Sequence, residues 1–591
     1  MKLKKLVIAA TLAGSLGTVQ FALALSELAT AIQSGDPVAV RNLIRNKADV
    51  NAVERDGTTP LQWAVYEENT QIVDYLVKAK VDVNAANREG VTPLALAAET
   101  GNEDVAAMLI KAGADVNKTL ANGETPLMMA ARTGDVATIE MLIANGATVD
   151  AVENLRGTSA LMWAAANRNA PAVQALIEAG ADIALNSKGN NEGRNNPYLA
   201  PTARERIRDF YENSGLGKAE EKPDELKTAD DKSAEVTREE LMKRMPPDLL
   251  KDFMEEEARN KTQAAANQNA GTAPKKMRRG GLTALHFAVR ENDPESVKVL
   301  IEAGADINEV SEFGWTPLLT ATQNRFYQLG KYLLEHGANP NIANEGGWNP
   351  LYIATDNRNI EGGDYPTRKP DIDHLDYIKL LLAAGADPNI RMASSTETRT
   401  IFTHQWLDEN GATPFLRASQ SSDLELMKLL LEYGADPKMT TALGVTPLMV
   451  ASGIAWVEGV TFEWSEAANK EAIKMLIDLG NDVNAQDRED HRTAAMGAAH
   501  KGRTYAVQML ADAGADLGLR DIGSRDSLNK LAGTTWQAID YAEGLVRVGV
   551  QSAQSHPETS KLIRELMIAK GLEVPPEGRT LDSICVVDIC K

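Results

Sequence analysis

The chain has 591 residues, of which 25% are charged, and its formal net charge is −21 at pH 7. A surface this acidic repels polyanions, which argues against nucleic acids and anionic membranes as partners. The same charge is compatible with a basic partner, and it also serves solubility.

Residues 1–24 have the pattern of a secretory signal peptide. Three lysines within the first five residues make the start basic, an apolar run spans residues 6–23, and Ala22-Leu23-Ala24 is typical of a cleavage site. We therefore expect cleavage between Ala24 and Leu25 and a bacterial protein that is periplasmic or secreted. A membrane anchor is the alternative interpretation. No later stretch approaches the roughly 20 apolar residues of a membrane span, so we expect no membrane contact after cleavage.

A leucine-centred pattern recurs along the rest of the chain. It is clearest as Thr-Pro-Leu at Leu61, Leu94 and Leu127, which are 33 residues apart. A fixed period near 33 predicts a stack of small units, none of which buries its apolar face alone. Counting one consensus position per unit gives twelve units, with that position at residues 28, 61, 94, 127, 161, 285, 318, 351, 415, 448, 495 and 539.

Within each unit the sequence predicts two short helices and a turn. In the third unit, Thr92 is expected to cap a helix and Pro93 to occupy its first position, where a missing N–H costs nothing. A second apolar stripe predicts another helix, and Gly113 is placed to end it in a left-handed conformation. Residues 114–117 then lead into an extended finger.

This pattern resembles the ankyrin repeat, whose units read G-x-T-P-L-H-x-A-A and, after a second helix, G-A-D-V-N. Gly-Ala-Asp begins at Gly113, Gly180, Gly304, Gly385, Gly434 and Gly514. The resemblance covers most of the mature chain. It implies an all-α solenoid of about twelve helix-turn-helix units with finger turns, which binds another protein through its concave face.

Added segments interrupt the stack. The largest, residues 188–280, is charged and predicted to be partly helical or disordered, and it is either a solvated spacer or a docking segment. It separates repeats one to five, residues 25–187, from repeats six to twelve, residues 281–574. We therefore expect a break between repeats five and six, with two halves that move relative to each other. Smaller additions lie between the two helices of repeats eight, ten and twelve.

The C-terminal tail, residues 575–591, holds both cysteines of the chain, Cys585 and Cys590. In an oxidising compartment they could pair and close a small local loop. Free thiols and an intermolecular link are the alternatives.

Sequence motifs for catalysis are missing. The chain has no HExxH, no nucleophile elbow, no phosphate-binding loop and no dinucleotide fingerprint, so we expect neither an enzyme nor a cofactor. No metal site is expected either: Asp371, Asp373 and Asp376 lie close together, but they lack the glycine and distal glutamate of a calcium loop. His286 occupies the histidine position of the repeat, where a structural hydrogen bond is expected.

The ankyrin resemblance implies partner contacts at the finger tips, at the residue between Gly and Thr-Pro, and just after Ala-Ala. The second of these positions holds a tryptophan in two adjacent repeats, and exposed Trp and Arg are enriched at interface hot spots. The alternative is that each ring packs against the next finger. The predicted partner-binding residues are Trp315, Trp348, Arg290, Glu291, Gln323, Asn324, Asp356 and Asn357.

A second aromatic group lies in the insertions of repeats eight and ten, at Tyr365, Trp456, Phe462 and Trp464. We expect these insertions to lie near enough to touch. They form either a small core of their own or a second partner site.

The expected function is that of a non-catalytic protein–protein interaction scaffold with one unidentified protein partner. Alternatives are a periplasmic inhibitor or protector of a specific enzyme, a secreted effector acting in another cell, and an enzyme built on the insertions.

Overall fold

The computed structural model describes residues 27–188, 280–359, 368–394, 407–456, 462, 464–523, 535–546 and 554–579. The signal segment with its Ala24–Leu25 cleavage site, nearly all of the 188–280 insertion, Tyr365, Cys585 and Cys590 lie outside these ranges. The chain forms two compact units, residues 1–187 together with 282–591, and residues 188–281.

Twelve helix pairs follow one another in the described residues, which contain no strand. This confirms the predicted all-α repeat architecture. The pairs are α2 (Glu27–Gln33) and α3 (Pro37–Arg45), α4 (Pro60–Tyr66) and α5 (Thr70–Lys78), α6 (Pro93–Thr100) and α7 (Glu103–Lys111), α8 (Pro126–Thr133) and α9 (Val136–Ala144), α10 (Ala160–Ala166) and α11 (Ala170–Glu178), α15 (Ala284–Arg290) and α16 (Pro294–Glu302), α17 (Pro317–Gln323) and α18 (Tyr327–Glu335), α19 (Pro350–Arg358) and α20 (His374–Ala383), α21 (Pro414–Ser421) and α22 (Leu424–Glu432), α23 (Pro447–Ser452) and α24 (Glu466–Asp478), α25 (Ala494–His500) and α26 (Thr504–Asp512), and α27 (Ala538–Ala542) and α28 (Pro557–Ala569).

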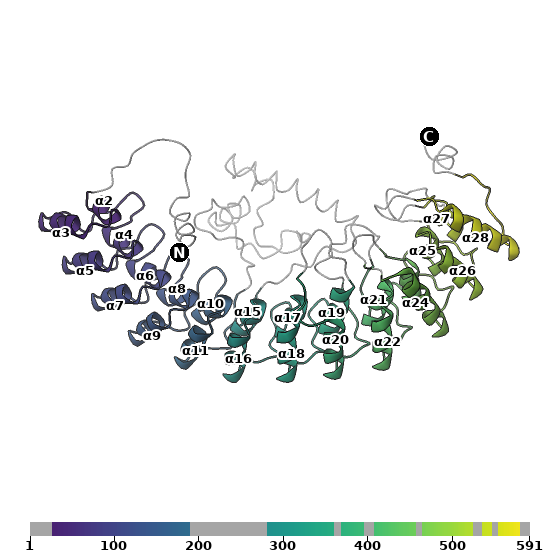
Figure 1. Ribbon diagram of the computed structural model, residues 1–591, viewed down its shortest axis with the longest axis horizontal. Helices are drawn as coiled ribbons and strands as arrows, with labels where there is room; N and C mark the ends of the chain where they lie inside the picture. Colours follow the sequence, from purple (N-terminus) through teal and green to yellow (C-terminus); the bar gives the residue numbers. More distant parts are fainter. Residues whose placement is uncertain are drawn as a thin grey trace, which may run out of the picture. The chain divides into compact units, whose positions relative to one another are not determined.

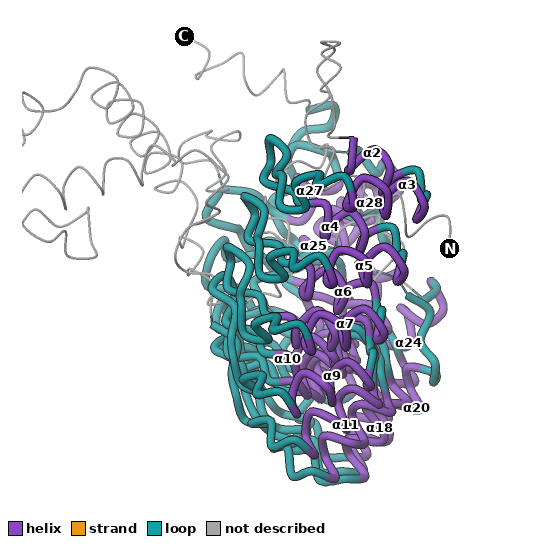
Figure 2. Tube along the Cα trace, turned by 90° about the vertical axis from the view of Figure 1, so that its left-hand side faces the viewer, coloured by secondary structure: helices purple, strands orange, loops and turns teal. Residues whose placement is uncertain are grey.

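The helices form two layers. The first helix of each repeat packs against the first helices of its neighbours, and most second helices pack against the second helix of the next repeat. Figure 1 shows the pairs side by side in chain order, and Figure 2 shows the connecting loops gathered along one side of the helices. The consensus leucines lie between the layers; Leu285, Leu318 and Leu351 are each 1% exposed or less. Apolar burial between adjacent repeats therefore holds the stack together.

The third repeat shows why the local signals give this shape. Thr92 caps α6, with its hydroxyl accepting from the N–H of Ala95 at 3.1 Å, and Pro93 is the first helical residue. After α7, Gly113 has φ = +94°, in the region that residues with a Cβ rarely adopt. Both predicted helix boundaries are confirmed.

The asparagine that ends the Gly-Ala-Asp-Val-Asn motif, or its variants, joins one finger to the next repeat. Asn84 donates from Nδ2 to the carbonyl of Gly113 at 3.0 Å and accepts from the N–H of Asp115 at 2.7 Å. Asn389 makes the same two bonds, to Gly434 at 2.9 Å and Asp436 at 2.7 Å, although an insertion lies between. The insertions thus leave the spacing of neighbouring repeats unchanged.

The expected break between repeats five and six is wrong. Helix α10 packs against α15, and α11 packs against α16, just as α8 packs against α10 and α9 against α11. Ser187 and Leu282 also exchange two hydrogen bonds of 3.0 Å, from the N–H of Ser187 to the carbonyl of Leu282 and from the N–H of Leu282 to Ser187 Oγ. The entropic cost of closing a loop rises slowly with its length, so a long insertion does not prevent two apolar faces from meeting.

Candidate partner-binding face

Repeat five shows two positions that lie next to each other on the first-helix layer. Trp163, two residues after the consensus leucine, donates from Nε1 to Thr158 Oγ1 at 2.8 Å. Thr158 stands in repeat five where Trp315 stands in repeat seven, just before the helix cap. We call the surface formed by these two positions and the adjacent finger residues the inner face.

Three tryptophans of the inner face, Trp63, Trp163 and Trp315, are half-buried against the core. Trp63 donates from Nε1 to Glu54 Oε1 at 3.0 Å, and its ring meets Tyr66 edge-on with 5.9 Å between centroids. The hydrogen bonds of Trp63 and Trp163 fix the orientations of these two rings before any partner arrives. Little side-chain entropy therefore remains to be lost on binding.

Carboxylates accompany the rings. Glu124 accepts from Asn122 Nδ2 at 2.7 Å, and burial raises the pKa of its carboxyl group. Burial likewise raises the pKa of Glu54. Arg132 pairs with Glu99 and places its guanidinium 5.5 Å from the centroid of Trp163. The inner face of repeats two to five thus combines aromatic rings with partly desolvated acids.

The structure contradicts the expected exposure of Trp348. Its side chain is only 2% exposed, and it meets Trp315 edge-on with 5.7 Å between centroids and an interplanar angle of 88°. Burying a large aromatic ring against another ring is more favourable than leaving both in water. Trp315 alone of this pair keeps an accessible surface.

Two further predicted contact residues have structural partners. Asp356 is 7% exposed and forms an ion pair of 2.7 Å with Arg417 Nε, while Asn357 donates from Nδ2 to the carbonyl of Thr322 at 2.9 Å. The prediction of Asp356 as a surface contact is therefore wrong. Its carboxylate is buried because it serves as the counter-charge of the buried Arg417 guanidinium.

The other predicted residues remain at the surface. Arg290 is exposed, pairs with Glu291 at 3.0 Å and lies 4.8 Å from the ring centroid of Phe287. Asn324 is exposed and donates to the carbonyl of Thr320 at 2.8 Å, and Gln323 is half-buried. Six of the eight predicted residues thus keep an accessible surface: Arg290, Glu291, Trp315, Gln323, Asn324 and Asn357.

The second aromatic group is partly brought together. Phe462 and Trp464 meet edge-on at 5.3 Å, and Trp464 donates from Nε1 to Asn359 Oδ1 at 3.1 Å. The insertion of repeat ten thus contacts the end of α19 in repeat eight, although Trp464 stays 42% exposed. Trp456 lies apart from this pair, 5.0 Å from Lys501 Nζ to its ring centroid.

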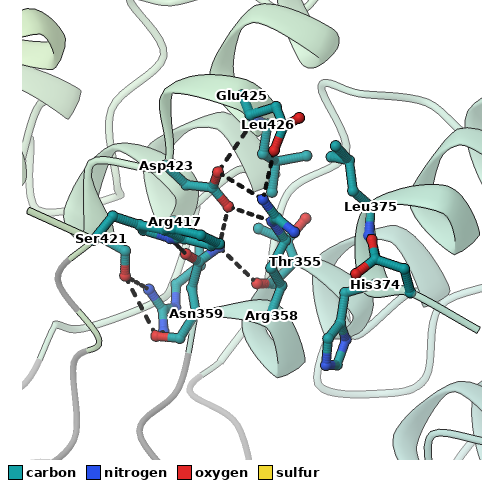
Figure 3. A network of polar contacts seen from close by, with 12 residues as sticks. Thr355, Arg358, Asn359, His374, Leu375, Arg417, Ser421, Asp423, Glu425 and Leu426 are labelled. Atoms are coloured by element: carbon teal, nitrogen blue, oxygen red, sulfur yellow. Dashed lines mark hydrogen bonds and ion pairs between the residues drawn. The ribbon is translucent and has the colours of Figure 1, made fainter. Parts of the chain in front are cut away.

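A buried polar network lies beneath that contact (Figure 3). Arg417 is fully buried; besides Asp356 it donates to the carbonyl of Asn359 at 2.8 Å and to Ser421 Oγ at 3.0 Å. Arg358 adds an ion pair of 2.7 Å with Asp423. These bonds satisfy the two guanidinium groups and join repeats eight and nine.

Sequence reasoning missed Trp63 and Trp163. Both occupy the variable position between the consensus histidine and the Ala-Ala pair. The same position holds Arg417 in repeat nine, where it is buried. Listing that variable position repeat by repeat would have found the two tryptophans, although their exposure follows only from the packing.

The aspartates that follow α19 in the sequence do not form a metal site. In the part of the chain that is described, no group of three acidic, histidine or cysteine side chains could hold a metal ion. Asp373 instead caps α20, accepting from the N–H of Leu375 at 2.8 Å, and Asp371 accepts from the N–H of Gln328 at 3.0 Å. Across the described helices, none is long and apolar enough to cross a membrane.

Comparison with known protein families finds matches on both sides of the insertion. A model described as "Ankyrin repeats (3 copies)" matches residues 28–120, 113–187 and 285–392, and one described as "Ankyrin repeat" matches residues 410–442. The chain belongs to the ankyrin repeat family. The matched ankyrin repeats lie on both sides of the 188–280 insertion, where the sequence pattern also has them.

Curated relatives of this ankyrin repeat chain share one short segment with it. Protein phosphatase 1 regulatory subunit 27 from Homo sapiens and from Mus musculus are each 48% identical over 46 residues, which is 8% of this chain and 30% of those proteins. The chain thus matches less than a third of the length of these relatives.

Proposed function

We propose that this ankyrin repeat protein is a non-catalytic scaffold that binds one protein partner through its inner face. The observation that carries the proposal is the set of half-buried tryptophans, two of them fixed by hydrogen bonds to Glu54 and Thr158. Rigid, partly exposed tryptophans are the residues that most often dominate protein interfaces. The matched relatives are named as regulatory subunits, which agrees with a non-catalytic role.

Replacing Trp63 and Trp163 by alanine is expected to weaken partner binding by at least about 2 kcal/mol, or about thirtyfold in Kd. Both rings are half-buried at the edge of the core, outside the set of buried core residues, so circular dichroism should remain that of the native chain. The partner is first captured with the wild-type protein and identified, and its Kd is then measured by calorimetry.

The control is Tyr433→Ala, which removes a more exposed aromatic ring, 44% accessible, at the end of α22 in the other helix layer. This variant should bind as the wild type does. Normal binding by the tryptophan double variant would show that the site lies elsewhere, with Trp464 as the next position to test.

We further propose that the protein acts after export from a bacterial cell, in the periplasm or outside it. The basic start, the apolar run and Ala22-Leu23-Ala24 support this. Full-length protein expressed in a bacterium should appear in the exported fraction with Leu25 as its first residue, as determined by N-terminal sequencing. Membrane-bound material that retains Met1 would contradict the proposal. Inhibition or protection of a periplasmic enzyme, and action as a secreted effector in another cell, are the forms that such binding could take.

A further inference from the structure

Repeat two carries the side chains of a cation-recognition site. Resting on the proposed function, we infer that Glu54, Trp63 and Tyr66 form a site on the inner face that takes an arginine or lysine side chain of the protein partner. The partner segment that lies on the inner face is accordingly basic.

The chain itself shows how such a site is filled. In repeats three to five, Arg132 pairs with the carboxylate of Glu99 and lies 5.5 Å from the centroid of the Trp163 ring. One guanidinium thus has a carboxylate and an aromatic ring as its neighbours on the inner face. A cation gains both from the ring quadrupole and from the opposite charge in such a position.

Repeat two has the same chemical groups without an internal cation. Trp63 stands at the repeat position of Trp163, is half-buried, and is held by its 3.0 Å hydrogen bond to Glu54. Tyr66 adds a second half-buried ring at 5.9 Å. Within the described ranges no lysine or arginine pairs with Glu54, and none lies over either ring.

The local electrostatics agree with a cationic occupant. Burial is the first cause of the raised pKa of Glu54, and the neighbouring carboxylate of Asp56 adds to it. An approaching positive charge stabilises the ionised form of a carboxyl group in this environment. A carboxylate has about four acceptor positions, so Glu54 can keep its bond to Trp63 and still accept from a partner.

The test uses the full chain and a phage-displayed library of random dodecapeptides as the probe. Peptides retained by the wild type are expected to be enriched in arginine and lysine, and one of them is synthesised with a fluorescent label for anisotropy measurements. Glu54→Gln should weaken this peptide by about fivefold, the effect of losing one ion pair while the cation–π contact with Trp63 is kept. The glutamine can still accept from Trp63, so the ring stays in place.

Two matched variants separate recognition from general charge attraction. Glu89→Gln removes one negative charge from an exposed finger position of the next repeat, and it should change the Kd less than twofold. Arg132→Gln frees Glu99 and Trp163 and should create a second site, which raises the peptide stoichiometry from one to two.

Retained peptides without basic residues, equal losses in Glu54→Gln and Glu89→Gln, or unchanged stoichiometry in Arg132→Gln would overturn the inference. The proposed function fails separately, through normal binding of the captured partner by the Trp63 and Trp163 double variant.

Discussion

Replacing Asp356 by alanine is expected to lower the free energy of unfolding by about 3–5 kcal/mol, because it leaves a buried guanidinium without its counter-charge. Arg417 has no exposed surface and makes its 2.7 Å ion pair with Asp356 from the centre of α21. Water cannot replace the lost carboxylate there. Urea unfolding followed by circular dichroism measures the loss, and hydrogen exchange should place it in α19 and α21, since repeat arrays couple mainly to neighbours.

A surface pair and a double replacement provide the controls. Glu302→Ala removes an exposed partner of Lys298, 3.8 Å away, and should change stability by less than about 1 kcal/mol. Combining Asp356→Leu with Arg417→Met should recover most of the stability, because two apolar side chains of similar volume need no partners. A loss below about 1 kcal/mol in Asp356→Ala would mean that the network does not stabilise the stack.

Lowering the pH from 6.5 to 4 is expected to reduce the free energy of unfolding by about 3 kcal/mol through His286. Burial lowers the pKa of His286 to about 4, from an ordinary value of 6.5. Between these two values the unfolded chain binds a proton that the folded chain does not. The contribution is therefore complete above pH 6.5, is lost as the pH falls toward 4, and changes no further below that.

The bonds of His286 explain the preference for the neutral ring. Nδ1 accepts from the N–H of Thr283 at 3.3 Å, so Nε2 carries the proton and donates to the carbonyl of Trp315 at 2.9 Å. Protonation of Nδ1 would remove that acceptor. The bond to the carbonyl of Trp315 in repeat seven survives protonation, but the bond from Thr283 is lost and a charge is placed in a buried position.

His286→Gln is the matched control, because Gln62 fills the same position of repeat two. Gln62 accepts from the N–H of Thr59 at 2.7 Å and donates to the carbonyl of Val91 at 2.6 Å. The difference in unfolding free energy between wild type and variant should shift by about 3 kcal/mol from pH 6.5 to pH 4. Other titrating groups, such as His374, act in both proteins and cancel. A difference that is constant with pH would contradict the assignment.

The accessible part of the inner face could be located from the sequence only in part. Trp315 and Trp348 occupy the same repeat position, yet the first is half-buried and the second is 2% exposed. Their sequence contexts, Gly-Trp-Thr-Pro and Gly-Trp-Asn-Pro, do not separate the two cases. Exposure depends on what the neighbouring repeat and finger place over the ring, which is a property of the assembled stack.

The sequence by itself determined the twelve helix pairs, because short-range signals specify them: a cap such as Thr92, in many repeats a proline at the first helical position, an apolar stripe, and in most repeats a closing glycine such as Gly113. The tertiary structure alone decided that repeats five and six join directly, that Trp464 reaches α19, and that Arg417 is buried where repeat two carries Trp63. These outcomes depend on contacts between residues far apart in the chain. Such contacts follow from which apolar faces and charges meet across the stack, and no local pattern encodes them.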